Sequence, residues 1–417
     1  MVTPAHSHPG YRWFIAGMGT LLQLCLGAVY AWSYFQQPLV DTYGWRNTQV
    51  AWTFSLAIGF LGVAAAVGGV LLPKFGPRKL AVAGSLCYGA GYLLAAMALH
   101  MRSLPLLWIG YGVVGGIGLG LGYVTPVATA AKWFPDKKGL VTGMVVMGFG
   151  FGALLMSKVI APALTAAFPN QLAEVFAGIG VTLGLTSLLA ASCLRNPPDT
   201  AAVVAGGEKA WPRLVSRRFV LMWLVFFCNI VAGIAIISFQ SPLLQDLLKK
   251  IDPHLSPAIL ATYGATLIAV SSVFNGLGRF AWGGMSDRLG QIHTFRLMLA
   301  SQVIAFIALM LTGNPWVFVP LICYILLCYG GGFGVMPSFV LNTFGPRLMP
   351  VLYGCILTAW SAAGIVGPQV IAWLKDRYGP QASGYAFALG AGLLMLGFLL
   401  SLLLTPAKPG DTPSTDG

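Results

Sequence analysis

The sequence predicts an all-α integral membrane protein in which twelve transmembrane helices form two six-helix bundles related by pseudo-symmetry. Three observations lead to this fold class: the composition, a series of long apolar runs, and a repeat between the two halves of the chain. Of the 417 residues, 57% are hydrophobic and 8% are charged, whereas a soluble domain carries about 25% charged residues. So few charges cannot cover a water-exposed surface of this size, so a lipid bilayer is the expected surrounding.

Long apolar runs account for most of the chain. A helix that crosses a bilayer needs about 20 predominantly apolar residues, and the chain contains twelve such runs. They lie at residues 13–35, 48–72, 80–99, 104–131, 140–162, 173–194, 219–243, 258–284, 295–313, 315–340, 351–373 and 384–405. No small-residue cleavage site follows the first run, so we expect a retained helix and not a signal peptide. Gly313, Asn314 and Pro315 divide the ninth run from the tenth, because these residue types favour turns.

One longer polar segment divides the runs into two groups of six. It extends from residue 195 to residue 218 and contains the pairs Pro197-Pro198 and Gly206-Gly207. We therefore predict a cytoplasmic N-terminus at 1–12, a six-helix bundle at 13–194, a cytoplasmic linker at 195–218, a second bundle at 219–405 and a cytoplasmic tail at 406–417.

Three short segments of the first half recur in the second half. Residues 35–39 resemble residues 239–243, residues 69–76 resemble residues 283–290, and Pro126 matches Pro337, with offsets of 204, 214 and 211. Each match alone is weak, but the near-constant offset indicates a duplicated unit. The two predicted bundles are therefore parallel repeats of one another.

The distribution of basic residues predicts the orientation of the helices. With the N-terminus inside, sixteen Lys and Arg residues lie on the cytoplasmic side, seven lie outside, and Arg279 lies within a span. The acidic residues divide into six inside and five outside, without a bias. A bias of Lys and Arg that Asp and Glu do not share is typical of the positive-inside rule. We expect both termini to be cytoplasmic.

Composition and motifs also exclude several classes of function. The formal net charge is +13, but the basic residues form no dense block, so nucleic acid is not an expected partner. The seven cysteines form no C-x-x-C pair, which argues against a metal site, and we predict no cofactor. No His or acid lies in the middle of a span to serve as a general base, and no H-E-x-x-H or G-x-S-x-G motif is present. An enzyme is therefore not expected.

Arg279 is the residue that points most directly to a ligand. It precedes Asp287 by eight residues, which places it about 12 Å from the cytoplasmic boundary at a rise of about 1.5 Å per residue. An arginine at this depth costs about 2.5 to 3.5 kcal/mol, and no acid within a span can pair with it. One interpretation is an arginine held by backbone carbonyls or lipid phosphate. We favour a site for a diffusing anion, since the planar guanidinium matches a carboxylate.

Tyr123, in the other half of the chain, is predicted to lie at the same depth in the membrane as Arg279. It precedes Lys132 by nine residues on the fourth span, so it lies about as deep as Arg279. Its hydroxyl can donate a hydrogen bond to the second oxygen of a carboxylate. The alternative is a tyrosine that only packs in the core.

The segments between spans resemble a known family. Gly283, Asp287, Arg288 and Gly290 form a Gly-x-x-x-Asp-Arg-x-Gly pattern after the eighth span. Together with the two six-span repeats, this pattern resembles the major facilitator superfamily. The resemblance implies that these four residues act in gating, with the acid as a latch. The first copy of the loop has Pro73 in place of the acid, which leaves the first latch without its carboxylate.

Three further segments resemble the monocarboxylate transporters and the related oxalate–formate antiporters. They are residues 30–33, 132–140 and 275–279. The resemblance implies that Arg279 binds the substrate carboxylate with Tyr123 beside it. It also implies that Tyr30 and Gln49 line the first half of the site, and that Tyr329 and Phe333 line the second half. Asn275 stands where monocarboxylate carriers of this kind often have an Asp, and Trp360 stands where oxalate-type exchangers have a second cation.

The expected function is therefore secondary active transport of a small monocarboxylate such as lactate or pyruvate. Because one cation suits one carboxylate, a dicarboxylate would leave a negative charge unpaired. The resemblance favours a proton as co-substrate and a plasma (inner) membrane as the location. An anion exchanger of the oxalate–formate type and an anion-selective channel remain alternatives. A cation exporter is disfavoured, because Arg279 repels cations.

Overall fold

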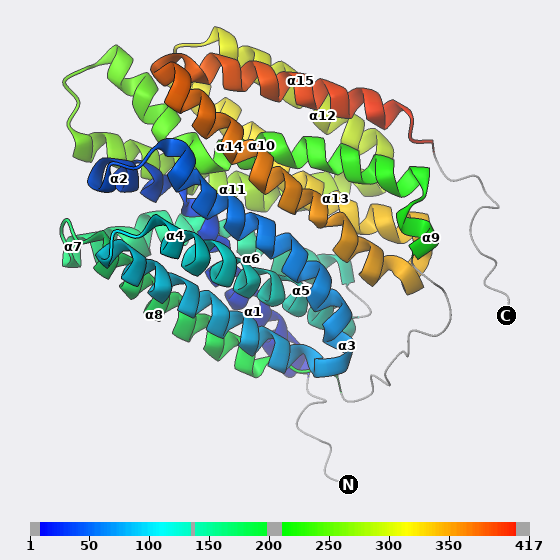
Figure 1. The fold of residues 1–417 in the computed structure, drawn as a ribbon. Coiled ribbons are helices and arrows are strands. Elements are labelled where there is room, and N and C mark those ends of the chain that lie inside the picture. Colours follow the sequence, from blue (N-terminus) through cyan, green and yellow to red (C-terminus); the bar gives the residue numbers. More distant parts are fainter. Residues whose placement is uncertain (1–8, 135–137, 198–210, 406–417) are drawn as a thin grey trace, which may run out of the picture.

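The computed structural model describes residues 9–134, 138–197 and 211–405. These residues form helices only, and twelve of the helical segments are long and apolar enough to cross a membrane. The helices are α1 (Pro9–Gly27), η2 (Ala28–Ala31), α2 (Ser33–Tyr43), α3 (Asn47–His100), α4 (Leu104–Leu107), η3 (Trp108–Gly115), α5 (Gly116–Trp133), α6 (Lys138–Leu155), η4 (Met156–Ile160), α7 (Ala161–Ala167), α8 (Leu172–Cys193), α9 (Trp211–Leu214), α10 (Arg217–Ile251), α11 (Pro257–Leu289), α12 (Gln291–Leu311), α13 (Pro315–Ile356), α14 (Thr358–Tyr378), η5 (Gly379–Gln381) and α15 (Ala382–Leu402) (Figure 1). The predicted fold class and span number are confirmed.

The helices lie in two bundles that follow the two halves of the chain. Helices α1–α8 form one bundle and α10–α15 form the other, and the first and last described helices start and finish at the same end of the molecule (Figure 1). Residues 1–8 of the predicted N-terminus, residues 198–210 of the predicted linker and the whole predicted tail, 406–417, lie outside the described residues. Several spans extend past their apolar runs. Helix α10 continues to Ile251, and its last turn contains Lys249 and Lys250, which interact favourably with the helix dipole.

Two glycines give the repeated loop the same backbone shape in both halves. Gly76 has φ +76° and ψ 165°, and Gly290 has φ +78° and ψ 150°. These are corresponding positions of the segments 69–76 and 283–290. Residues with a side chain rarely adopt this left-handed φ, so glycine is required where the chain turns between spans. The shared geometry agrees with the repeat inferred from the sequence.

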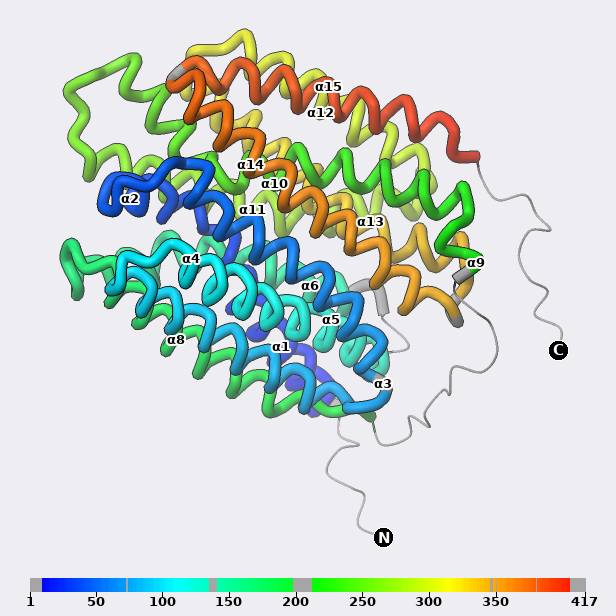
Figure 2. Tube along the Cα trace, viewed as in Figure 1, coloured from blue at the N-terminus to red at the C-terminus, as the bar shows by residue number. Residues whose placement is uncertain are grey.

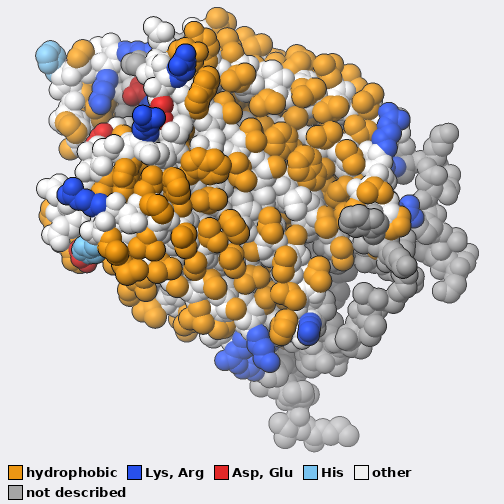
Figure 3. All heavy atoms as spheres, viewed as in Figure 1, with side chains coloured by type: hydrophobic (Ala, Val, Ile, Leu, Met, Phe, Trp, Pro, Cys, Tyr) orange, Lys and Arg blue, Asp and Glu red, His pale blue; other side chains and the backbone are white. Residues whose placement is uncertain are grey.

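The surface is apolar around the middle and charged at the two ends. In Figure 3, hydrophobic side chains cover the central band of the visible face, Lys and Arg gather toward both of its ends, and Asp and Glu are visible at one end. Large apolar side chains in the middle of spans, such as Leu185 of α8 and Ile304 of α12, are 64% and 70% exposed. In water such a band would be strongly unfavourable. The band is expected in lipid, and the protein is a multi-pass integral membrane protein.

The two bundles pack along two pairs of helices, α3 with α14 and α6 with α11. Helices α3 and α14 run side by side through the molecule (Figure 2). Small residues allow this close approach: a Cβ atom on Gly62 would lie 2.7 Å from the Leu357 carbonyl oxygen. A Cβ atom on Gly150 would lie 2.6 Å from the Gly276 Cα atom. Arg279 lies on α11, where it faces Phe149 of α6 across the second of these helix pairs.

Candidate functional site

Arg279 is buried at the interface between the bundles. It lies on α11, and 3% of its surface is exposed. Its guanidinium carbon lies 5.1 Å from the ring centre of Phe333 and 5.9 Å from that of Phe149. Aromatic faces attract a cation at these distances. They supply no hydrogen-bond acceptors of the kind that a guanidinium prefers.

Phe149 and Phe333 face Arg279, and four further aromatic rings contact these two or one another; we call the six aromatic residues and Arg279 the Arg279 cluster. The members besides Arg279 are Tyr30, Tyr123 and Phe149 from the first bundle and Tyr329, Phe333 and Trp360 from the second. Trp360 joins the two sides, since its ring centre lies 5.3 Å from Tyr123 and 4.8 Å from Phe333. All six aromatic side chains are at most 2% exposed. The sequence-based prediction placed Tyr30, Tyr123, Tyr329, Phe333 and Trp360 near Arg279, and the structure brings them together.

Glycines at helix crossings bring the cluster together. A Cβ atom on Gly278 would clash with the Leu327 carbonyl oxygen, and one on Gly334 would clash with the Arg279 carbonyl oxygen. Helices α11 and α13 therefore cross with their backbones in contact, which packs Phe333 against Arg279. In the first bundle, a Cβ atom on Gly27 would clash with the Phe149 carbonyl oxygen. This crossing places the rings of Tyr30 and Phe149 5.0 Å apart.

Hydrogen-bond donors in the cluster lack partners. The three guanidinium nitrogens of Arg279, the hydroxyl of Tyr123 and the indole nitrogen of Trp360 are buried with no hydrogen-bond partner among the described residues. In the described part of the chain no carboxylate forms an ion pair with Arg279. An unpaired buried polar group costs about 1 to 3 kcal/mol, and a charged group costs more. Every one of these groups can donate, so the complementary ligand is an acceptor with negative charge.

A tyrosine pair connects the two bundles beside Arg279. The hydroxyls of Tyr30 and Tyr329 lie 2.6 Å apart and form a hydrogen bond. Tyr30 also lines a narrow cavity, too small to hold a water molecule, whose walls include the polar side chains Gln240, Ser271, Ser272 and Asn275. Ser271 donates a hydrogen bond to Gln240 over 2.7 Å. Tyr30 therefore belongs both to the Arg279 cluster and to the lining of this cavity.

Asn275 lies one helical turn before Arg279 on α11 and lines the same cavity. Its side-chain oxygen has no partner among the described residues. A Cβ atom on Gly330 would lie 2.8 Å from that oxygen, so the amide packs against α13. The structure therefore places Asn275 at the edge of the cluster.

Gln49 is the one predicted ligand contact that the structure places elsewhere. It lies in the first turn of α3, where its side-chain oxygen accepts a hydrogen bond from the Arg46 backbone N–H over 2.9 Å. Its own carbonyl accepts a hydrogen bond from the Trp108 indole. The side chain is thus used to satisfy a helix end, a common role for Gln at the third helical position. Gln49 is therefore not brought to the Arg279 cluster.

The four predicted gating residues lie at the end of α11, away from the cluster. Gly290 ends the helix with its positive φ, and Ser286 donates a side-chain hydrogen bond to the Gly283 carbonyl over 2.7 Å. Asp287 and Arg288 are exposed and have no ion pair with another described side chain. The geometry fits a loop that changes partners, and a latch at Asp287 stays a prediction.

Phe149 is a cluster member that the sequence did not single out. Its ring contacts Tyr30, Tyr123 and Trp360, and the Arg279 guanidinium faces it. The available signal was its place between Gly148 and Gly150, because a large side chain between two glycines lies at a close helix crossing. That pattern does not reveal which helix lies opposite.

Tyr123→Phe is expected to weaken ligand binding without weakening the fold. The hydroxyl is buried without a partner, so its removal relieves a desolvation cost in the unliganded protein. A bound carboxylate would lose one charged hydrogen bond, which corresponds to about a tenfold loss of affinity. Thermal unfolding with and without lactate measures both effects. A parallel loss of stability in the ligand-free state would show that the hydroxyl has a structural role.

Comparison with known proteins identifies the family. The family model of the Major Facilitator Superfamily matches residues 15–368. The chain is 26% identical to the oxalate:formate antiporter of Oxalobacter formigenes, over 95% of this chain and 92% of that protein. It is 24% identical to monocarboxylate transporter 11 of Homo sapiens, over 99% of this chain and 87% of that protein. Both confirm the predicted resemblance.

A solved structure supports the fold. The D-xylose-proton symporter superimposes with a TM-score of 0.74, covering 97% of this chain and 100% of that chain at 16% sequence identity. At this identity the likeness concerns the fold alone. The two six-helix bundles, the repeated loop and the match to the family model agree, and the chain belongs to the Major Facilitator Superfamily of membrane transporters, not to an enzyme family.

Proposed function

We propose that this transporter carries small monocarboxylates of the lactate and pyruvate type by alternating access, with Arg279 binding the substrate carboxylate. One observation carries the proposal: Arg279, Tyr123 and Trp360 present unpaired buried donors to one place at the interface of the bundles. A carboxylate accepts hydrogen bonds through two oxygens and supplies the missing negative charge. Substrate binding would therefore stabilise groups that folding leaves unpaired.

The count of charges supports a single carboxylate. Arg279 is the one cation of the cluster, and Trp360, buried with 0% exposure, stands where a second cation would be needed. A dicarboxylate would place its second charge among aromatic rings, which costs several kcal/mol. The aromatic walls suit the small apolar part of a short monocarboxylate.

An exchanger of the oxalate–formate type is the second candidate. The similarity to the oxalate:formate antiporter, which extends over 95% of this chain, favours it. The two candidate functions differ in which acid should compete with labelled lactate for uptake. For a monocarboxylate carrier we expect oxalate to inhibit labelled lactate uptake at least about a hundredfold more weakly than pyruvate does, because of the unpaired second charge.

Counterflow into proteoliposomes tests the proposal. Vesicles that contain the purified protein are preloaded with unlabelled lactate, and uptake of labelled lactate is measured with pyruvate or oxalate outside. Accelerated uptake from preloaded vesicles would support a carrier, whereas a channel would show no acceleration. Stronger inhibition by oxalate than by pyruvate would overturn the assignment to monocarboxylates.

The same vesicles test the coupling. Moving an anion inward against −100 mV costs about 2.3 kcal/mol, so uptake requires a co-transported proton or exchange for another anion. No Asp or Glu belongs to the Arg279 cluster, and we infer that the proton travels with the weak-acid substrate. An imposed inward pH gradient should therefore accelerate net lactate uptake. Uptake that is insensitive to the gradient, but needs internal lactate, would support exchange. We further infer a plasma (inner) membrane location with cytoplasmic termini.

A further inference from the structure

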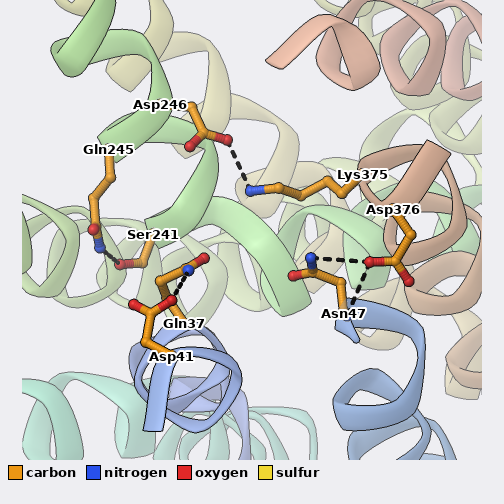
Figure 4. Close-up of polar contacts among 8 residues, drawn as sticks. All are labelled: Gln37, Asp41, Asn47, Ser241, Gln245, Asp246, Lys375 and Asp376. Carbon is orange, nitrogen blue, oxygen red and sulfur yellow. Dashed lines mark hydrogen bonds and ion pairs between the residues drawn. The ribbon is translucent and has the colours of Figure 1, made fainter. Parts of the chain in front are cut away.

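The first two backbone N–H groups of α3, those of Asn47 and Thr48, have their hydrogen-bond acceptor in the other bundle. The Asp376 carboxylate accepts four hydrogen bonds there, from the backbone N–H groups of Asn47 and Thr48 at 3.0 and 2.9 Å, and from their side chains at 3.1 and 2.7 Å. Asp376 lies near the end of α14, in the second bundle, whereas α3 belongs to the first (Figure 4).

The sequence of α3 explains why this end depends on a partner. Its N-cap position is occupied by Arg46, whose side chain has no acceptor. Other helices are capped by their own residues: Ser216 accepts from Phe219 at the start of α10, and Ser256 accepts from Ile259 at the start of α11. A carboxylate at a helix N-terminus also interacts favourably with the helix dipole. Asp376 of the second bundle thus supplies the side-chain hydrogen-bond acceptor that α10 and α11 obtain from their own N-cap residues.

A neighbouring ion pair ties Asp376 to its own bundle. Lys375 contacts Asp246 of α10 with an N–O distance of 2.8 Å (Figure 4). The side chain of Lys375 is 9% exposed, so this stretch of α14 is held in place. Separation of α3 from α14 at this end would therefore break the contacts of Asp376, and α14 would stay with α10.

The contacts of Asp376 lie far from the cluster around Arg279. Trp360 and Asp376 are sixteen residues apart on α14, which corresponds to about 24 Å along the helix. The orientation predicted from the basic residues places this end outside the cell. A second contact between the bundles, from Lys158 to Thr266 at 2.6 Å, joins η4 to α11. Opening toward the outside requires both to separate.

We propose that Asp376 is the outer latch of this transporter, which holds the N-terminus of α3 against α14 while the outward side is closed. The proposal rests on alternating access of the two bundles and not on the identity of the substrate. Loss of the latch should favour the outward-open state. It should not affect the integrity of either bundle, because each of the four hydrogen bonds crosses between them.

Asp376→Asn removes the charge and places an amide donor where two donors already point. We expect the ratio of outward-open to closed protein to rise about five- to tenfold, the effect of losing a helix cap. Thr48→Val removes one donor from the other side of the contact and should shift the ratio in the same direction by a smaller factor. Asp41→Asn is the matched control, since Asp41 accepts its hydrogen bond from Gln37 of the same helix.

Distances between nitroxide labels measure the two states. The full chain, with its seven cysteines replaced by alanine, receives label pairs at exposed positions: Thr42 and His254 for the outer end, and Lys79 and Leu289 for the inner end. The proposal expects longer outer distances and shorter inner distances in Asp376→Asn and Thr48→Val, and wild-type distances in Asp41→Asn. Unchanged outer distances in both latch variants would overturn it, as would an equal shift in Asp41→Asn. If Asp376→Asn does not fold, Thr48→Val alone decides.

Discussion

Arg279→Ala should abolish lactate binding and transport while the protein still folds. The variant removes the cation and the buried donors that have no partner among the described residues. Truncating one member of a buried charged contact costs about 2 to 5 kcal/mol, so we expect affinity to fall at least about a hundredfold. The ligand-free protein should be as stable as wild type or more stable, because an unpaired buried charge disappears. Lactate counterflow and thermal unfolding measure the two effects.

Arg296→Ala is the matched control for this prediction. Arg296 lies on α12, and its guanidinium donates hydrogen bonds to the carbonyls of Ser401 and Leu404 at 3.1 and 3.0 Å. It therefore satisfies the C-terminal end of α15. Its loss should lower thermal stability and leave lactate affinity within about twofold of wild type, because it has no part in the site. Equal loss of lactate binding in both variants would contradict the assignment of the site to Arg279.

Gly150→Ala should slow transport about tenfold or more. Gly150 lies on α6 where it crosses α11 of the other bundle, and a Cβ atom there would lie 2.6 Å from the Gly276 Cα atom. Ser272 of α11 strengthens this crossing, because its hydroxyl donates to the Gly150 carbonyl and accepts from the Leu154 backbone N–H. An added methyl group would force the backbones apart at a cost of about 1 to 3 kcal/mol. The closed state that brings the Arg279 cluster together would be less populated.

Gly143→Ala tests whether the effect depends on this crossing. Gly143 lies on the same helix and faces the same partner, but its Cβ atom would lie 3.5 Å from the nearest atom of the Phe280 ring. That distance is an ordinary contact, so the rate of lactate counterflow should stay within about twofold of wild type. A wild-type rate in Gly150→Ala, or an equal loss in Gly143→Ala, would show that the crossing does not limit the cycle.

The fold could be predicted because its signals are local. Each span is a run of apolar residues, and the repeated loop carries its own glycine, as the matching backbone of Gly76 and Gly290 shows. The ends of the spans were less predictable. Helix α10 continues to Ile251, well past its apolar run. Its last turns contain polar as well as apolar residues, so the hydropathy of the sequence does not mark them as part of the span.

The site could be predicted only in part. Depth along a helix was enough to pair Arg279 with Tyr123, since both positions are fixed by the 1.5 Å rise. Phe149 was missed because its role depends on which helices cross next to it. In helices that are apolar on all sides, the pattern of apolar residues does not indicate which helices are neighbours. Gln49 was misplaced for the opposite reason. The resemblance to the transporters assigns Gln49 a position along the chain, but it does not say which group the side chain contacts. In the structure the Gln49 side-chain oxygen accepts a hydrogen bond from the Arg46 backbone N–H at the start of α3.

The most direct test is a calorimetric titration of the purified protein with lactate and with its neutral isostere lactamide. If Arg279 binds the carboxylate, wild type will bind lactate and bind lactamide at least about a hundredfold more weakly, because the amide lacks the charge. Arg279→Gln will bind both ligands with the same low affinity. Undiminished lactate binding by Arg279→Gln, or equal affinity of wild type for the two ligands, would contradict the proposal that this arginine recognises the charge of the substrate.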